Sequence, residues 1–353
     1  MNKETMIVGV VQFVNAPYKD ETYRYLQEHY PVKLVIGTFG FEDNHPEWNY
    51  ANRDAHRKDS VRDYFALYGK KIDALLVSGY RENVSRYALI YAKLHSIPVV
   101  MVADTVESGR FGFVKKMIYN MANAFWVPGK RSQEYFISKR VDAARIFTGA
   151  YTYDYKAVRG RTASADRSVL RRDYGISGKD FVFLFVGKLI PGRRVGDLLN
   201  AFERLKPDNL KLIIVGDGED KDAVDKAAAR DKRIIGIAGV ELDRLYDLFS
   251  MCDAYVHPGK EPYSCAVMQA AAAGMPVVAS NEAGAADDFL TDGGNGKIFP
   301  YGNIEAMRKA MQEVCENITE YMEAAKKVQD HVCEDLSIEH AAGQLFEALR
   351  FIG

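Results

Sequence analysis

The sequence contains few of the features that define several common protein classes. Its 353 residues include four cysteines, none in a C-x-x-C pair and none at zinc spacing from a histidine. This predicts free thiols, as expected in a reducing compartment. No apolar run approaches the roughly 20 residues that span a bilayer. The N-terminus leads directly into an apolar stretch without a signal peptide, so we expect a cytoplasmic protein.

The chain also lacks a dominant charge of either sign, because 47 basic residues face 48 acidic ones. The balance gives no reason to expect a nucleic-acid partner. A basic excess nevertheless gathers in the second half of residues 1–150. Solvated helix faces are the simpler interpretation, and contact of this N-terminal part with an anionic membrane or acceptor is the alternative. The residues concerned are Lys115, Lys116, Lys130, Arg131, Lys139 and Arg140.

Two glycine motifs that bind nucleotides are absent. No G-x-x-x-x-G-K-S/T segment occurs, which excludes a P-loop. Gly9 is followed by Val10 and Val11, so the first apolar stretch does not carry the dinucleotide-binding fingerprint.

What the sequence does contain is a regular alternation of apolar, strand-length stretches and helical patterns. This alternation predicts an α/β protein with parallel sheets covered on both faces. At 353 residues the chain is long enough for two such domains. The predicted strands are 6–14, 32–36, 73–78, 98–102, 124–127, 145–148, 181–186, 210–215, 233–237, 252–256, 275–280 and 297–299.

The alternation is interrupted once, at residues 149–168, which are rich in Gly, Thr, Ser and Arg and have no apolar period. We interpret this segment as a linker and predict domains at 1–160 and 161–336. A last helix at about 337–353 is expected to pack back on the first domain. Residues 51–68 are predicted to be helical, and the aromatic, turn-rich residues 39–52 to form a functional loop.

Residues 257–280 organise the second half of the chain. Pro258 and Pro262 interrupt a strand, and a helix follows with its N-cap near Ser264. Glu261 therefore lies in a loop at the carboxyl end of a strand, where open α/β sheets bind ligands. The free N–H groups of the helix favour an anion at the same place. His257, which precedes a proline, is interpreted as structural.

Two further loops and one acidic residue lie at predicted strand ends. The cations Lys188, Arg193 and Arg194 would suit a diphosphate, although they could equally be surface charges. Gly216 and Gly218 mark a tight turn into a helix. Asp104 could act as a base or could cap the turn that follows it.

Taken together, these segments resemble the GT-B retaining glycosyltransferases of family 4, the glycosyltransferases group 1 family. The resemblance covers about residues 181–300 in order and spacing. It implies a GT-B fold, with two doubly wound Rossmann-like domains that face each other across a cleft. The segments that carry it are Gly187-Lys188-Leu189, Arg193-Arg194, Val215-Gly216-Asp217-Gly218, Glu261, Gly274-Met275-Pro276-Val277-Val278-Ala279-Ser280 and Gly294-Asn295-Gly296.

The resemblance also implies roles for individual residues. Lys188 and Arg193 would neutralise the diphosphate of a nucleotide-sugar, and Glu261 would touch the transferred sugar. Gln269 stands where the family has a second glutamate that holds the ribose, and Asp104 where many members have a histidine near the sugar. The implied catalytic residues are Glu261, Lys188, Arg193 and Asp104; the implied donor-binding residues are Gly187, Arg194, Gly216, Gly218, Tyr263, Ser264, Cys265, Ala266 and Gln269.

The implied function is transfer of a sugar to an acceptor hydroxyl with retention, without a metal or a cofactor other than the donor. The acceptor, a glycan or a lipid-linked sugar, would lie on the N-terminal domain, in polysaccharide or glycolipid biosynthesis at the inner face of the membrane. A nucleotide-sugar 2-epimerase of the same fold and a non-catalytic nucleotide-sugar-binding subunit are the alternatives.

Overall fold

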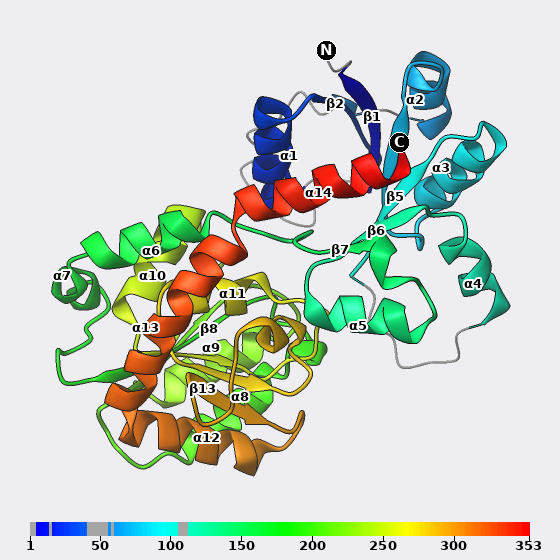
Figure 1. The fold of residues 1–353 in the computed structure, drawn as a ribbon. Helices are drawn as coiled ribbons and strands as arrows, with labels where there is room; N and C mark the ends of the chain where they lie inside the picture. Colours follow the sequence, from blue (N-terminus) through cyan, green and yellow to red (C-terminus); the bar gives the residue numbers. More distant parts are fainter. Residues whose placement is uncertain (1–4, 14–15, 41–55, 58–59, 105–111) are drawn as a thin grey trace. The chain divides into compact units, whose positions relative to one another are not determined.

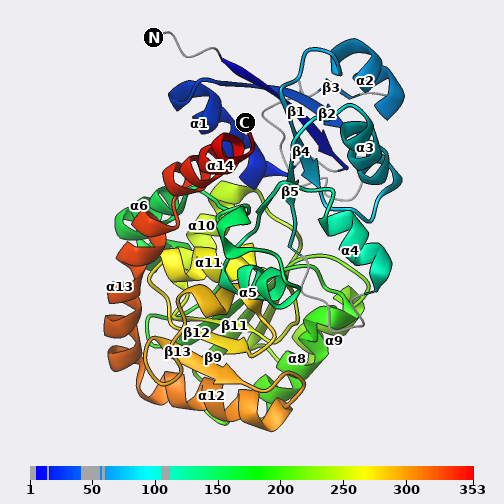
Figure 2. The same ribbon diagram turned by 45° about the vertical axis from the view of Figure 1, so that its right-hand side comes forward.

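The computed structural model describes residues 5–13, 16–40, 56–57, 60–104 and 112–353. These residues form two compact units (Figures 1 and 2). The first unit consists of Met1–Tyr153 together with Leu336–Gly353, and the second of Asp154–Asp335. The chain therefore returns to the first unit at its C-terminus.

In the first unit, the described residues form a seven-stranded parallel sheet in the order β3-β2-β1-β4-β5-β6-β7. The side chains of its strands belong to two separate hydrophobic clusters. Val8 and Leu76 lie in one cluster, and Val11 and Val77 lie in the other. Both faces of the sheet are therefore covered. The strands are β1 (Met6–Gln12), β2 (Val32–Thr38), β3 (His56–Arg57), β4 (Ala74–Ser78), β5 (Val99–Val102), β6 (Ala124–Trp126) and β7 (Ile146–Phe147).

The helices of this unit divide between the two faces. Helices α1 (Pro17–His29) and α14 (Ile338–Ile352) lie side by side on one face, as Figures 1 and 2 show. The C-terminal helix thus belongs to the core of the first unit, where its Ala341 and Leu345 are fully buried. The other face carries α2 (Val61–Tyr68), α3 (Asn83–Leu94), α4 (Phe113–Tyr119) and α5 (Lys130–Ser138); the short helix η2 (Ala143–Arg145) precedes β7.

The second unit contains a six-stranded parallel sheet in the order β10-β9-β8-β11-β12-β13. Its strands are β8 (Phe181–Val186), β9 (Leu210–Val215), β10 (Ile234–Ile237), β11 (Ala254–His257), β12 (Val277–Ser280) and β13 (Gly296–Phe299). Its helices are α6 (Tyr155–Ser164), α7 (Arg167–Arg172), η3 (Pro191–Arg193), α8 (Val195–Glu203), α9 (Lys221–Arg230), α10 (Leu242–Met251), α11 (Cys265–Ala272), η4 (Gly284–Asp288), α12 (Ile304–Glu316) and α13 (Ile318–Asp335).

The strand order of the second sheet positions the candidate loops. The order reverses between β8 and β11, so the connections that follow these two strands, to β9 and to β12, lead toward opposite edges of the sheet. Open α/β sheets bind ligands at such a switch point, outside the carboxyl ends of the strands. The loop after β8 contains Lys188 and Arg193, and the loop after β11 contains Glu261.

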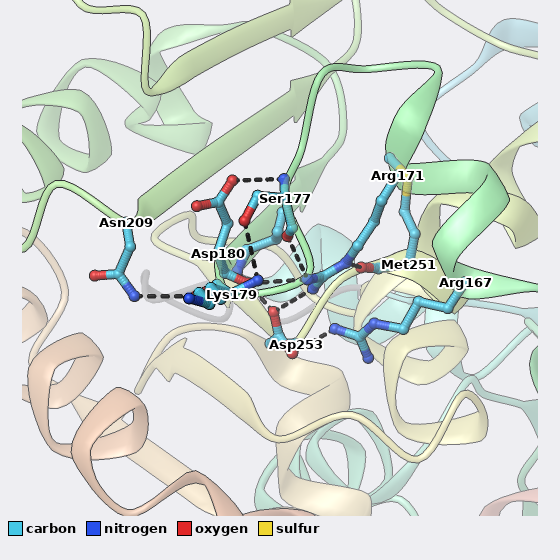
Figure 3. Close-up of polar contacts among 9 residues, drawn as sticks. Arg167, Arg171, Ser177, Lys179, Asp180, Asn209, Met251 and Asp253 are labelled. Atoms are coloured by element: carbon cyan, nitrogen blue, oxygen red, sulfur yellow. Dashed lines mark hydrogen bonds and ion pairs between the residues drawn. The ribbon is translucent and has the colours of Figure 1, made fainter.

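The opposite end of these two strands is held by an ionic clasp, which Figure 3 shows in close-up. Asp253, just before β11, pairs with Arg167 and with Arg171, whose Nη2 lies 2.7 Å from Oδ2. The same carboxylate accepts a hydrogen bond from the N–H of Val182 in β8 at 2.7 Å. Arg171 also donates to the carbonyls of Met251 and Asp180, each at 2.9 Å. The clasp therefore ties α7 to the amino ends of β8 and β11.

The linker prediction at residues 149–168 was wrong in part, because Tyr155–Ser164 forms α6 and Arg167–Arg172 forms α7. Aspartates cap both helices: Asp154 accepts from Ala157 N at 2.8 Å, and Asp166 from Ser168 N at 3.0 Å. These N-caps were the overlooked signal, since the low apolar content alone resembles a loop.

Two predictions concern residues near the gaps. Residues 56–57 form strand β3 rather than the predicted helix, and the helix described in this segment begins only at Val61. Of the predicted functional loop at 39–52, residues 41–52 lie outside the described part of the chain.

Candidate functional site

Two glycine turns fix the backbone of the loop after β8. A Cβ atom on Gly216 would lie 1.9 Å from the carbonyl oxygen of Gly187, and one on Gly218 would lie 2.4 Å from that of Leu189. Backbone hydrogen bonds join the same segments: Leu189 N donates to Asp217 O at 2.8 Å, and Asp220 N to Leu189 O at 2.9 Å. Only glycine permits this approach. The glycines predicted to bind a donor thus have a demonstrable packing role.

The three cations of this loop have different surroundings. Lys188 is exposed and has no carboxylate partner among the described residues. Arg194 has a left-handed backbone, with φ of 52°, and its Nε lies 2.5 Å from Asp197 Oδ2. Its guanidinium also lies 5.1 Å from the ring centroid of Tyr301, so this side chain helps to hold the loop. The hydrogen bond to Asp197 raises the pKa of Arg194.

Arg193 joins the two candidate loops directly. Its Nη1 donates to the carbonyl of Lys260 at 2.9 Å, and its Nη2 forms a short ion pair with Oε2 of Glu261. The backbone continues the link, because Lys260 N donates to Gly192 O at 3.0 Å. The structure therefore brings together two of the four residues predicted to be catalytic.

Glu261 is fixed through its backbone as well as its side chain. Its N–H donates to Glu282 O at 3.1 Å, and its carbonyl accepts from Gly284 N at 3.0 Å. The carboxylate is largely buried, and Oε1 lies 2.9 Å from Nε2 of His257. Burial raises the pKa of Glu261, but His257, Arg193 and Ser264 together outweigh it and hold that pKa below its usual value. The carboxylate is therefore ionised at neutral pH.

The N-terminus of α11 lies beside Glu261. Ser264 is its N-cap and accepts from Val267 N at 3.4 Å, so the first N–H groups of the helix, those of Cys265 and Ala266, are not used by the helix itself. Burial raises the pKa of the Cys265 thiol, which makes this cysteine a poor nucleophile. Burial also raises the pKa of Tyr263 well above its ordinary value.

Gln269 occupies the inner side of the same helix. Its side chain is buried, and its Nε2 has no hydrogen-bond partner among the described residues. A buried amide with unfilled donor capacity is costly in a folded protein, and such groups call for an explanation.

Asp104 belongs to the first unit, where it follows β5 and is half-buried. Its surroundings include Lys19, a buried lysine of α1 that donates to Ser78 Oγ at 3.2 Å. Burial lowers the pKa of Lys19 to about 8, although the charges of Asp104 and Asp20 oppose this shift. Sequence inspection missed Lys19, because a single lysine in an amphipathic helix has no distinguishing pattern.

His257 was also missed as a partner of Glu261. It is the last residue of β11, and its spacing of four residues from Glu261 across a proline-containing loop has no recognisable signature. Only the turn of the loop brings the two side chains together.

The described residues contain neither a cluster of metal ligands nor a helix that could span a membrane. No group of three or more His, Cys, Asp or Glu side chains lies close enough to hold a metal ion. No helix there is long and apolar enough to cross a membrane. The four cysteines are unpaired, as predicted.

The whole chain has the GT-B fold, as comparison with solved structures shows. A glycosyltransferase from Rickettsia africae ESF-5 superposes with a TM-score of 0.77 at 15% identity, covering 99% of each chain. Anabaena Alr3699/HepE in complex with UDP superposes with a TM-score of 0.74 at 18% identity, covering 98% of this chain and 100% of that one.

Sequence comparison adds a family match within the second unit. Residues 166–330 match the family model of the glycosyl transferases group 1. A GDP-mannose-dependent alpha-mannosyltransferase of Mycobacterium tuberculosis (strain CDC 1551 / Oshkosh) is 30% identical over 189 residues, which are 53% of this chain and 47% of that protein. The match thus spans about half the length of this relative. The family match therefore covers the part of the chain whose motifs predicted it.

Proposed function

We propose that the protein transfers a sugar from a nucleotide-sugar to an acceptor hydroxyl with retention at the anomeric carbon. The observation that carries this proposal is the pairing of Arg193 with Glu261 at the switch point of the second sheet, beside the N-terminus of α11. Cations, a fixed carboxylate and free helix N–H groups are there combined in one place. The family match supports the same activity.

Charge development during transfer explains why such a combination is useful. When the glycosidic bond breaks, negative charge grows on the leaving diphosphate. Lys188, Arg193 and the N–H groups at the start of α11 would stabilise that charge, and fixed donors of this kind often supply the largest part of a rate enhancement. With these cations in place, we propose that the reaction needs no metal.

Glu261 would orient the transferred sugar. Because its carboxylate is ionised and its backbone is anchored on both sides, it can accept hydrogen bonds from sugar hydroxyls at a fixed position. Arg193 would then serve both the carboxylate and the diphosphate. Asp104, in the first unit, is the fourth residue that we propose to be catalytic.

Gln269 would bind the nucleotide ribose. Because Nε2 is not exposed, a change of the side-chain rotamer would have to turn this unused donor toward a ribose hydroxyl. The bases of the ligands named for relatives differ, since one relative is GDP-mannose-dependent and one similar structure contains UDP. We therefore leave the base of the donor open.

The first unit has an exposed apolar surface that would contact the membrane in which the acceptor lies. We propose this contact at the cytoplasmic face of the membrane. Helix α4 exposes Phe113, Val114 and Met117, with exposed fractions of 76%, 67% and 53%. At 100° per residue these side chains share one side of the helix with Lys116. Apolar side chains flanked by lysine favour an interface of anionic lipid.

The proposed activity is tested by a thermal-shift screen of UDP-, GDP-, ADP- and dTDP-sugars, followed by a transfer assay with the stabilising donor. A donor at a hundredfold excess over its dissociation constant stabilises the native state by about 2.7 kcal/mol. Exchange of Lys188 and Arg193 for alanine together should lower turnover by about a hundredfold or more, since each donor to a developing charge contributes that order.

The matched control is the pair Lys206→Ala and Lys309→Ala, which removes two exposed charges of the same unit. Full turnover in the Lys188/Arg193 variant would show that this mechanism is wrong. Donor binding without transfer to any acceptor would support the non-catalytic alternative. The family match and the named relatives give no sign of an epimerase, and NMR of a donor-only incubation would detect one.

A further inference from the structure

His257 is a deeply buried titratable side chain beside the candidate site. Its exposed fraction is 1%. Two aromatic rings lie near the imidazole and nearly parallel to it: the centroid of Phe185 is 6.3 Å away at 21°, and that of Tyr255 is 6.4 Å away at 14°. Because the side chain is almost fully buried, the ring has little freedom to rotate. A histidine held in this way has a fixed direction for each nitrogen.

One of these nitrogens faces the carboxylate of Glu261, with 2.9 Å between Nε2 and Oε1. The contact is close, but neither ring nitrogen makes an aligned hydrogen bond with any described residue. The interaction is therefore mainly electrostatic. Nε2 must carry the proton for it to be attractive, because a deprotonated nitrogen would repel the carboxylate.

The second carboxylate oxygen of Glu261 has a different partner, the guanidinium of Arg193. The two oxygens are thus held by two groups on different elements, His257 at the end of β11 and Arg193 in the loop after β8. Without the histidine, the carboxylate could rotate so that both oxygens meet the guanidinium. Such a bidentate pair is the preferred geometry of Arg with a carboxylate, and it would withdraw both groups from a ligand.

We infer that His257 is a positioning residue, which holds Oε1 of Glu261 so that Arg193 and Glu261 remain two separate contacts for the donor. This inference rests on the proposed function, because it assigns His257 a role in the same site. The other titratable groups around the carboxylate are Tyr255 on β11 and Cys265 on α11. The Tyr255 hydroxyl donates to Val186 O at 3.0 Å and is not available to the carboxylate.

Two substitutions separate positioning from packing. His257→Phe retains an aromatic ring near Phe185 and Tyr255 but removes the N–H group. His257→Gln loses the ring and can place an amide N–H where Nε2 lies. A positioning role predicts that the Phe variant loses about tenfold to a hundredfold in kcat with a smaller change in donor KM, while the Gln variant recovers most of that loss. If His257 serves only to fill the core, the Gln variant should lose more kcat than the Phe variant. The melting temperatures of the two variants should then fall in the same order as their activities.

A second measurement does not depend on turnover. The pKa of the Glu261 carboxyl can be followed by 13C NMR of the protein alone, with Glu261→Gln to assign its signal. His257 contributes to the lowering of that pKa, so the pKa should rise in His257→Phe, and the acid limb of the activity profile should move to higher pH.

An unchanged Glu261 pKa in His257→Phe, or equal losses of kcat in the two variants, would overturn the inference. If the carboxyl shifts as expected but the wild-type protein transfers no sugar from any donor, the proposed function fails while the contact between His257 and Glu261 stands. The two failures are therefore distinguishable.

Discussion

Gly216 and Gly187 approach each other so closely that a Cβ on the former would overlap the carbonyl oxygen of the latter, at 1.9 Å. The two residues directly follow β9 and β8, which are neighbours in the second sheet. The position of the Lys188–Arg193 loop thus depends on the absence of a single side chain.

We predict that Gly216→Ala destabilises the protein by about 2–5 kcal/mol, because it adds a backbone clash at a φ of 150° that side chains rarely adopt. Thermal unfolding measures the effect. Gly178→Ala is the control, since a Cβ there would meet no atom within 4 Å. A melting temperature equal to that of the control would refute the prediction.

Because of Lys19, the free energy of unfolding of the first unit should change with pH in the alkaline range. Its folded pKa is about 8, below the usual 10.5. Below pH 8 the Lys19 side chain is protonated in both the folded and the unfolded state, and above pH 10.5 it is protonated in neither. Between these values the unfolded state binds more protons, so stability should rise with pH, by about 3 kcal/mol at most.

The comparison for Lys19 is Lys19→Met, which should lack this rise, whereas Lys93→Met, an exposed lysine of α3, should retain it. Urea unfolding at several pH values between 7 and 11 measures the difference. Both tryptophans of the chain, Trp48 and Trp126, lie before residue 154, so fluorescence reports on this unit. Parallel curves for wild type and Lys19→Met would contradict the shift.

Helix α4 should bind anionic vesicles. Sedimentation with phosphatidylglycerol vesicles should recover the wild-type protein, and recovery should fall about tenfold or more when Phe113 and Met117 are changed to serine, because burial of each large apolar side chain contributes about 1.5–3 kcal/mol. Val169→Ser with Leu242→Ser removes two exposed apolar residues elsewhere and should bind like wild type. Equal recovery of the two double variants would show that this helix does not serve as a lipid contact. The same conclusion would follow if wild type self-associates and only the α4 variant loses that self-association.

The sequence allowed most of the strands to be predicted, because buried parallel strands are continuous apolar runs; β8 and β9 have the predicted bounds. The loops at the switch point could be identified by their charges and glycines. The contact between His257 and Glu261 could not, since it depends on the path of a loop between two prolines. Helix α6 was missed because its apolar positions are few and its stability comes from the Asp154 cap and from packing on α10, α11 and α13.

The ionic clasp sets a limit on where the second unit can be cut from the chain. A fragment that begins at β8 would lack Arg167 and Arg171, and would leave the Asp253 carboxylate without either cation. The uncompensated charge would sit at the amino ends of the two strands whose opposite ends carry Lys188, Arg193 and Glu261. A fragment that keeps the clasp must therefore start before Arg167, and the compact second unit itself starts at Asp154, within the segment that the sequence had suggested was a linker.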